Sequence, residues 1–194
     1  FRDAVPGGRS VGIPGNMALM QSAHRKWGKL KWADLFQPAI KLAEDGYAVT
    51  PRLANTLGQM RALWADFPEA RAIYWQDDRP KRVGETVRNP AYAAFLKTLA
   101  KKGAKAFYTG QNAKAIIDAT GHSKRNPTII TKTDLTRYKA KDRDAVCAPY
   151  RTYTLCGMGP PSSGATTVLQ ILGMLERFDM KALGKDNAKS WHLI

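Results

Sequence analysis

The segment from Tyr153 to Gly164 constrains the fold of this chain more than any other stretch. It reads Tyr-Thr-Leu-Cys-Gly-Met-Gly-Pro-Pro-Ser-Ser-Gly, and an apolar run with helical spacing follows to Phe178. A strand formed by its first residues must end at the prolines, because proline has a fixed φ and no N–H for a sheet. Ser162 or Ser163 is placed to cap the following helix, and Gly164 would permit a close backbone approach. The segment predicts a strand, a rigid turn and a helix.

Helix signals dominate the sequence before this segment. The pairs Thr50-Pro51 and Asn89-Pro90 each join a capping side chain to a proline suited to a first helical turn. Thr131 and Asp134 have the spacing of a capping box, and Asn16 is placed as an N-cap. The expected helices cover about residues 16–27, 32–45, 51–65, 89–102, 112–120 and 131–138, and a short hairpin is expected from residues 73–75 and 82–84. Periodicity alone therefore predicts a helix-rich α+β chain.

The formal net charge of +15 raises the hypothesis of a basic module that binds nucleic acid or an anionic surface. The basic residues are dispersed, however, and aromatic residues do not recur among them as a base-stacking platform requires. We therefore expect a solvated basic surface and no nucleic-acid partner. No uninterrupted apolar run approaches the roughly 20 residues of a membrane-spanning helix, so no transmembrane segment is expected.

Cys147 and Cys156 are the two cysteines of the chain. If a hairpin turned near residues 149–151, Cys147 would face Thr154, and Cys156 would be a diagonal neighbour about 7–8 Å away. A disulfide requires Cα atoms within about 7 Å and well-aimed Cβ atoms. On this register we expect two free, partly buried thiols.

Several motifs together resemble the γ-glutamyltransferase family, also called the glutathione hydrolases. The family's large subunit carries a proline-rich Pro-Ser-Ser-Gly turn between a strand and a helix, as residues 161–164 do here. The other matching segments are Arg9–Gly15, Trp27–Leu30, Pro38–Gly46, Phe107–Gly110 and Ile130–Leu135. They occur in the family's order with similar spacing, so the resemblance covers nearly the whole chain. In this chain Gly159 stands where the family often has a further proline, and Ala165 where it often has a second glycine.

The resemblance implies part of the large subunit of an αββα N-terminal-nucleophile hydrolase. Residues 1–194 would be a single fragment of that subunit's domain, with a helical lobe over about 11–141 and a strand–turn–helix segment over about 142–180. The sequence opens with Phe1-Arg2-Asp3-Ala4-Val5, without an initiator methionine or a signal-peptide pattern, so we expect a piece of a larger precursor. The partner would be the small subunit of the same self-cleaving precursor, and the location periplasmic or extracellular.

The family's enzymes cleave the γ-glutamyl amide of glutathione and transfer the glutamyl group to water or an amino acid. Their nucleophile is the N-terminal threonine of the small subunit, whose α-amino group can act as the base. We expect this threonine, and the arginine that holds the substrate α-carboxylate, to lie outside this chain. No catalytic, substrate-binding, cofactor-binding or metal-binding residue is therefore assigned, and the fragment itself is expected to be inactive. An acylase-type relative on the same scaffold is the alternative function.

Other chemically suggestive residues have simpler interpretations. Ser162 and Ser163 lack the Gly-x-Ser-x-Gly elbow and a nearby histidine, so they are expected to serve the turn. Thr166 and Thr167 lie inside a helical run. The remaining candidates are interpreted as hairpin-tip, helix-end or surface residues without metal-ligand spacing: Asp77, Asp78, Glu44, Asp45, His24, His122 and His192. The fragment is expected to act as a scaffold with an exposed apolar face.

Overall fold

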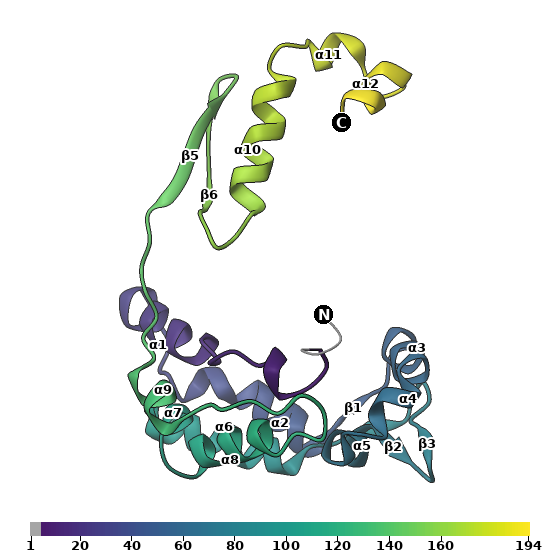
Figure 1. Cartoon of the computed structure of the whole chain (residues 1–194), viewed down its shortest axis with the longest axis vertical. Helices are drawn as coiled ribbons and strands as arrows, with labels where there is room; N and C mark the ends of the chain where they lie inside the picture. The colour runs from purple at the N-terminus through teal and green to yellow at the C-terminus, as the bar shows by residue number, and fades with distance from the viewer. Residues whose placement is uncertain (1–4) are drawn as a thin grey trace. The chain divides into compact units, whose positions relative to one another are not determined.

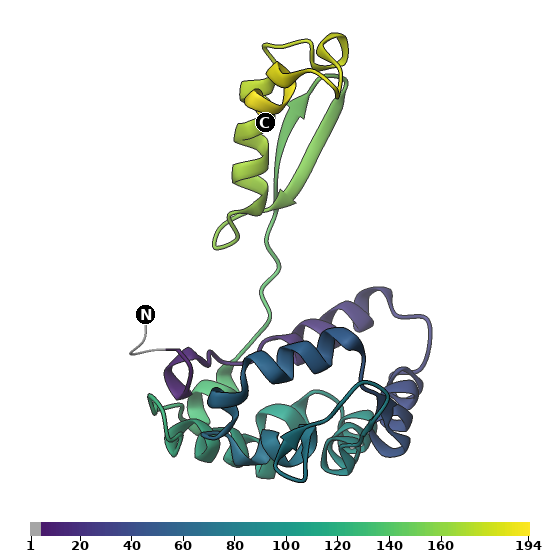
Figure 2. The ribbon, with the colours of Figure 1, turned by 90° about the vertical axis from the view of Figure 1, so that its right-hand side faces the viewer.

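A computed structural model describes residues 5–194 as a helix-rich α+β chain. It divides into two compact units, one up to residue 140 and one over residues 141–194. The first unit is formed by helices with short strands, and the second by a β-hairpin with helices (Figure 1; Figure 2). Among the described residues, no helix is both long enough and apolar enough to span a bilayer.

The first unit contains helices, 3₁₀ turns and short antiparallel strands. Its helices are α1 (Asn16–Trp27), α2 (Gln37–Asp45), α3 (Pro51–Gln59), α4 (Arg61–Trp64), α5 (Pro68–Tyr74), α6 (Pro90–Lys102), α7 (Lys105–Tyr108), α8 (Gly110–Gly121) and α9 (Lys132–Arg137). The 3₁₀ turns are η1 (Gly8–Ser10) and η2 (Asp34–Phe36). Strand β1 (Tyr47–Ala48) pairs with β4 (Thr86–Val87), and β2 (Trp75–Gln76) pairs with β3 (Arg79–Pro80).

Two apolar clusters hold the helices of this unit together. In one, Ile40 of α2 packs against Leu96 and Leu99 of α6, and Leu99 is fully buried. In the other, Leu135 of α9 is fully buried among residues of α7 and α8, with Tyr108 beside it. Buried side chains at helical spacing on facing elements are the main source of the unit's stability.

The predicted caps of three helices are confirmed. The Leu53 N–H donates to Thr50 Oγ1 at 3.2 Å, and the Tyr92 N–H donates to Asn89 Oδ1 at 2.9 Å. At α9 the Asp134 N–H donates to Thr131 Oγ1 at 3.2 Å, and the Thr131 N–H donates back to Asp134 Oδ2 at 2.8 Å. These bonds satisfy N–H groups that the first helical turn leaves without partners.

Other predicted boundaries were wrong. Asn16 is the first helical residue of α1 and does not cap it; Gly15 takes the N-cap position, and a Cβ there would lie 2.2 Å from the Tyr138 hydroxyl. The helix expected over residues 51–65 is interrupted at Met60. The predicted hairpin is displaced, because Asp77 and Asp78 both adopt positive φ and make the turn directly between β2 and β3.

The second unit is built on one antiparallel hairpin. Strand β5 (Ala145–Tyr150) pairs with β6 (Tyr153–Met158), and α10 (Gly164–Leu175) packs against both strands. Two short helices follow, α11 (Met180–Leu183) and α12 (Ala188–Leu193). The predicted strand, turn and helix are therefore confirmed, with the helix ending before Phe178.

The expectation of two free thiols was wrong, because Cys147 and Cys156 form a disulfide. The strand continues through Pro149, so the hairpin turns at Arg151 and Thr152, and Tyr150 pairs with Tyr153. This register places the cysteines directly opposite each other, with Cα atoms 4.1 Å apart. Proline is tolerated in the strand because a two-stranded hairpin leaves one side of each strand outside its ladder.

Candidate functional site

The turn between β6 and α10 is the part of the structure with the strongest functional signal in the sequence. The Ser162 N–H donates to the Gly159 carbonyl at 3.1 Å, and Ser162 Oγ accepts the Gly164 N–H at 3.4 Å. Ser163 occupies the N-cap position of α10, but its side chain makes no capping bond. Of the two serines predicted to cap the helix, only Ser162 accepts an N–H at its start through its side-chain oxygen.

Close packing fixes the start of α10 on the hairpin. A Cβ placed on Gly157 of β6 would lie 2.7 Å from Ala165 Cβ, and one on Gly159 would lie 2.8 Å from Val146 Cγ2. The close approach predicted for Gly164 is wrong, since a Cβ there would meet only Ser162 Oγ at 3.6 Å. Gly157 in β6, and not Gly164 in the turn, therefore allows α10 to approach the hairpin closely.

Hydrogen bonds fix the far end of the same helix. The Arg151 N–H at the hairpin turn donates to Glu176 Oε1 at 3.1 Å, and its guanidinium donates to the Phe178 carbonyl at 2.5 Å. The hairpin is therefore attached to both ends of α10. The turn between β6 and α10 is positioned by a rigid local framework.

Thr166 and Thr167 lie in the first turn of α10 and form hydrogen bonds to its backbone. Thr166 Oγ1 donates to the Ser163 carbonyl at 3.0 Å, and the Thr167 N–H donates to the same carbonyl at 2.9 Å within α10. A serine or threonine hydroxyl requires an adjacent base to attack an amide. The interpretation of Thr166 and Thr167 as helix residues agrees with these contacts.

The three histidines lie on different elements, and two of them have local partners. His24 Nε2 hydrogen-bonds to the Leu30 carbonyl at 2.8 Å, and its ring lies edge-on against Trp32. His122 Nδ1 hydrogen-bonds to the Asp118 carbonyl at 3.0 Å, and His192 lies in α12. Within residues 5–194, no group of three or more histidine, cysteine or carboxylate side chains could hold a metal ion.

Three of the acidic residues singled out in the sequence, Asp78, Glu44 and Asp45, form ion pairs with neighbours. Asp78 at the β2–β3 turn pairs with Arg71. At the end of α2, Glu44 pairs with Lys97 and Asp45 pairs with Lys41. The Asp78 pair connects α5 to the hairpin, the Glu44 pair connects α2 to α6, and the Asp45 pair lies within α2. These are structural uses of the carboxylates.

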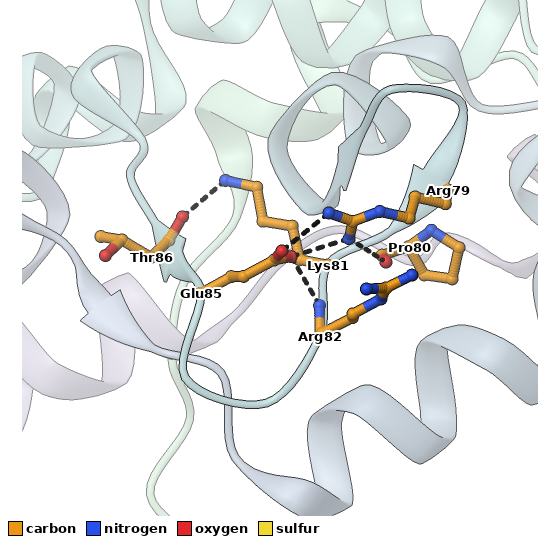
Figure 3. Close-up of polar contacts among 6 residues, drawn as sticks. All are labelled: Arg79, Pro80, Lys81, Arg82, Glu85 and Thr86. Carbon is orange, nitrogen blue, oxygen red and sulfur yellow. Dashed lines mark hydrogen bonds and ion pairs between the residues drawn. The ribbon is translucent and has the colours of Figure 1, made fainter.

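An ion-pair cluster that sequence patterns did not indicate surrounds Glu85 (Figure 3). Its carboxylate accepts two hydrogen bonds from the Arg79 guanidinium, at 2.8 and 2.9 Å, and one from the Arg82 N–H at 2.7 Å. The bonds from Arg79 and from the Arg82 backbone lower the pKa of Glu85 to about 2. The cluster ties β3 to the loop before β4, and no periodic signal marks it because the contacts cross a turn.

The outer surface of α10 is apolar. Val168 and Met174 are 51% and 62% exposed, and Trp191 of α12 is 68% exposed. The expected exposed apolar face is therefore present on this unit. Exposed apolar side chains at this density are typical of a surface that another chain segment covers.

Comparison with known proteins identifies the family. The family described as Gamma-glutamyltranspeptidase matches residues 2–194. The glutathione hydrolase proenzyme of Escherichia coli (strain K12) is 35% identical over 184 residues, covering 94% of this chain and 31% of the relative. The Acylase ACY 1 proenzyme of Pseudomonas sp. (strain V22) is 34% identical over 193 residues, covering 100% of this chain and 34% of the relative.

A solved structure extends the match to the fold. The crystal structure of Helicobacter pylori gamma-glutamyltranspeptidase superposes with a TM-score of 0.91 at 35% identity, over 99% of this chain and 54% of that chain. The chain spans about a third of the length of the two curated relatives. These matches agree with the ordered motifs and with the strand–turn–helix segment. The chain belongs to the gamma-glutamyltranspeptidase family.

Proposed function

We propose that this chain is part of the large subunit of an N-terminal-nucleophile enzyme that cleaves γ-glutamyl amides such as glutathione. The glutamyl group would pass to water or to an amino acid or peptide. The observation that carries this proposal is the family match over residues 2–194, together with the fold of the Helicobacter pylori enzyme. The partner would be a small subunit released from the same precursor by self-cleavage.

The chemistry would be supplied by residues outside this chain. A threonine hydroxyl at a new chain start would attack the γ-glutamyl carbonyl, with its own α-amino group as the base. Backbone N–H groups would stabilise the developing oxyanion. An acyl-enzyme would form as the amine leaves, and water or an acceptor amine would then release the glutamyl group. The Thr131 hydroxyl donates to the Asp134 carboxylate at 2.7 Å, but this contact belongs to the cap of α9 and is not assigned to these steps.

The role proposed for this chain is to support that site from a rigid framework. The disulfide and the Gly157–Ala165 contact hold the hairpin and α10 together, and the apolar surface of α10 is available to pack against the rest of the enzyme. Catalytic groups must be held within fractions of an ångström, so a framework of this kind contributes to activity without touching substrate.

The disulfide supports a location in the periplasm or outside the cell. Disulfides form and persist in oxidising compartments and are rare where thiol buffers keep cysteines reduced. Mass spectrometry of the protein isolated without reductant tests this part of the proposal. Two alkylated cysteines in freshly isolated protein would contradict it.

Acylase activity is the second candidate, because an acylase proenzyme matches the whole chain at 34% identity. Two matched substrates separate the candidates: γ-glutamyl anilide, and glutaryl anilide, which lacks only the α-amino group. A γ-glutamyl enzyme should strongly prefer the first, since a site that binds the ammonium rejects an analogue without it. An acylase should release aniline from the second.

The first experiment uses the full-length protein that contains this chain. It is purified, incubated and analysed by mass spectrometry for a backbone break that leaves an N-terminal threonine. A break accompanied by release of aniline from γ-glutamyl anilide is expected. An intact protein that is inactive on both anilides would overturn the proposal of an N-terminal-nucleophile enzyme.

A further inference from the structure

Helices α1, α7 and α9 lie near one another in the first unit (Figure 1). Residues of α1, of the start of α7 and of the segment around α9 line a basic cleft. Its volume is about 670 Å³. This lies within the range of roughly 300–1,000 Å³ that is usual for small-molecule sites. The cleft is therefore large enough to take a small organic ligand.

Positive charge is concentrated in this cleft. Arg25, Lys26, Lys105 and Lys139 line it, and no carboxylate is among its lining residues. Elsewhere in the unit some lysines, such as Lys97, form ion pairs with acidic neighbours, and others, such as Lys101, form none with the described residues. Like charges in one concave surface repel each other and raise the local concentration of anions. The arrangement is stabilised when an anion enters.

Three of these cations are not neutralised within the described part of the chain. Arg25, Lys105 and Lys139 form no ion pair with any residue from 5 to 194. Arg25 lies in the last turn of α1, where a positive charge complements the helix dipole. This explanation does not extend to Lys105 and Lys139, which come from two other segments. The three charges therefore line one cleft without a carboxylate partner.

Two tyrosine rings contribute an apolar wall to the cleft. Tyr108 and Tyr138 stack with ring centroids 5.8 Å apart and an interplanar angle of 14°. The Tyr108 hydroxyl donates to the Pro14 carbonyl at 2.7 Å and accepts the Ala18 N–H at 3.1 Å, so its ring is fixed. Three alanines also line the cleft, beside uncharged polar residues such as Gln21 and Thr136. Such a surface suits a flat apolar body rather than a fully hydrated ion.

From these observations we propose that the cleft binds a small phosphate ester that has a flat apolar body. The phosphate group would be held by Arg25, Lys105 and Lys139, and the apolar body would lie along the wall formed by Tyr108 and Tyr138. Arginine and lysine both donate charge-assisted hydrogen bonds to phosphate oxygens. This site is independent of the proposed hydrolase chemistry.

Calorimetric titration of the full-length protein with phenyl phosphate tests the proposal at low ionic strength. We expect saturable binding that is tighter than that of inorganic phosphate, while phenol without the phosphate does not bind. Raising the salt concentration should weaken the binding, because exposed charges are screened over about 10 Å at 0.1 M. No saturable binding of phenyl phosphate, or equal binding of phenol, would overturn the proposal.

Matched variants assign the binding to the cleft. The triple variant Arg25→Gln, Lys105→Gln and Lys139→Gln should weaken phenyl phosphate binding by roughly tenfold or more, since it removes three charge contacts. The control removes the same charge outside the cleft through Arg52→Gln, Lys31→Gln and Lys101→Gln, and should bind almost as tightly as the unmodified protein. All six side chains are exposed, so both variants are expected to fold. Equal weakening in the two variants would show a nonspecific charge effect and contradict the assigned site.

Discussion

Gly157 of β6 lies directly against Ala165 of α10, and a Cβ on Gly157 would come within 2.7 Å of Ala165 Cβ. Ala165 itself replaces a glycine that the family often has after the Pro-Ser-Ser-Gly turn. The methyl group at 165 thus fills space that the absent side chain at 157 leaves open. The two positions determine together how closely the helix approaches the hairpin.

The substitution Gly157→Ala should destabilise the second unit by about 1–3 kcal/mol, because the added methyl group forces α10 away from the strand. Urea denaturation of the full-length protein measures the effect. Gly173→Ala in α10 is the control, since a Cβ on Gly173 would meet nothing within 4 Å. It should be neutral or stabilising by about 0.5–1 kcal/mol. Equal stability of the Gly157→Ala variant and the unmodified protein would contradict the packing described.

Removal of the disulfide should lower the stability of the hairpin. Cys147 and Cys156 are separated by nine positions, and closing a loop of this size stabilises the folded state by about 2–3 kcal/mol. The double variant Cys147→Ser and Cys156→Ser should therefore unfold at lower temperature than the oxidised protein. Reductant should lower the unfolding temperature of the unmodified protein but leave the variant unchanged. If reductant still lowered the unfolding temperature of the variant, a disulfide other than Cys147–Cys156 would be the cause of the effect.

The carboxylate of Glu85 should make stability depend on pH in the acidic range. Its folded-state pKa of about 2 lies below the ordinary value of 4.5, so the stabilisation is fully present above about pH 4.5 and is lost as pH falls through 2. Glu85→Gln should lower the unfolding temperature at pH 7, and the difference from the unmodified protein should shrink between pH 4.5 and 2.

Asp144→Asn is the matched control for this pH series. Asp144 is exposed and forms no ion pair or hydrogen bond with the described residues. The unfolding temperature of the Asp144→Asn variant should follow that of the unmodified protein at every pH. A Glu85→Gln variant with a difference that does not change with pH would rule out the charged contacts with Arg79 as the cause.

The cap of α9 offers a further test in the first unit. Thr131→Ala removes the oxygen that accepts the Asp134 N–H and should cost about 1 kcal/mol. Thr133→Ala is the control, because the Thr133 side chain is exposed and takes no part in the capping box. Chemical denaturation should separate the two variants. Equal effects would mean that the cap contributes nothing beyond helix propensity.

Local signals in the sequence predicted much of the fold. Thr50, Asn89 and Thr131 each combine a capping side chain with a suitable following residue, and each cap forms as predicted. The prolines after β6 correctly marked the end of the strand. These predictions succeed because a cap or a proline acts on a few neighbouring residues, and distant contacts seldom override it.

Features that depend on register or on contacts across space were not predictable in the same way. The turn was expected near residues 149–151 but lies at Arg151 and Thr152, and this shift made Cys156 rather than Thr154 the partner of Cys147, so that a disulfide forms in place of two expected thiols. The Glu85 cluster and the basic cleft each bring together side chains from separate segments of the chain. No regular spacing in the sequence connects these residues, so pattern analysis could not find them. The sequence did yield the family, because several weak motifs in a fixed order are jointly specific.

The turn at Arg151 has a consequence for proteolysis. The residue is exposed at the tip of the hairpin with a φ of 57°, and β5 and β6 lie on either side of it. Exposed tips of this kind are preferred sites of proteolytic cleavage. Cleavage by trypsin after Arg151 would leave both strands joined through Cys147 and Cys156. The nicked protein would keep its full mass in a denaturing gel and separate into two pieces only after reduction.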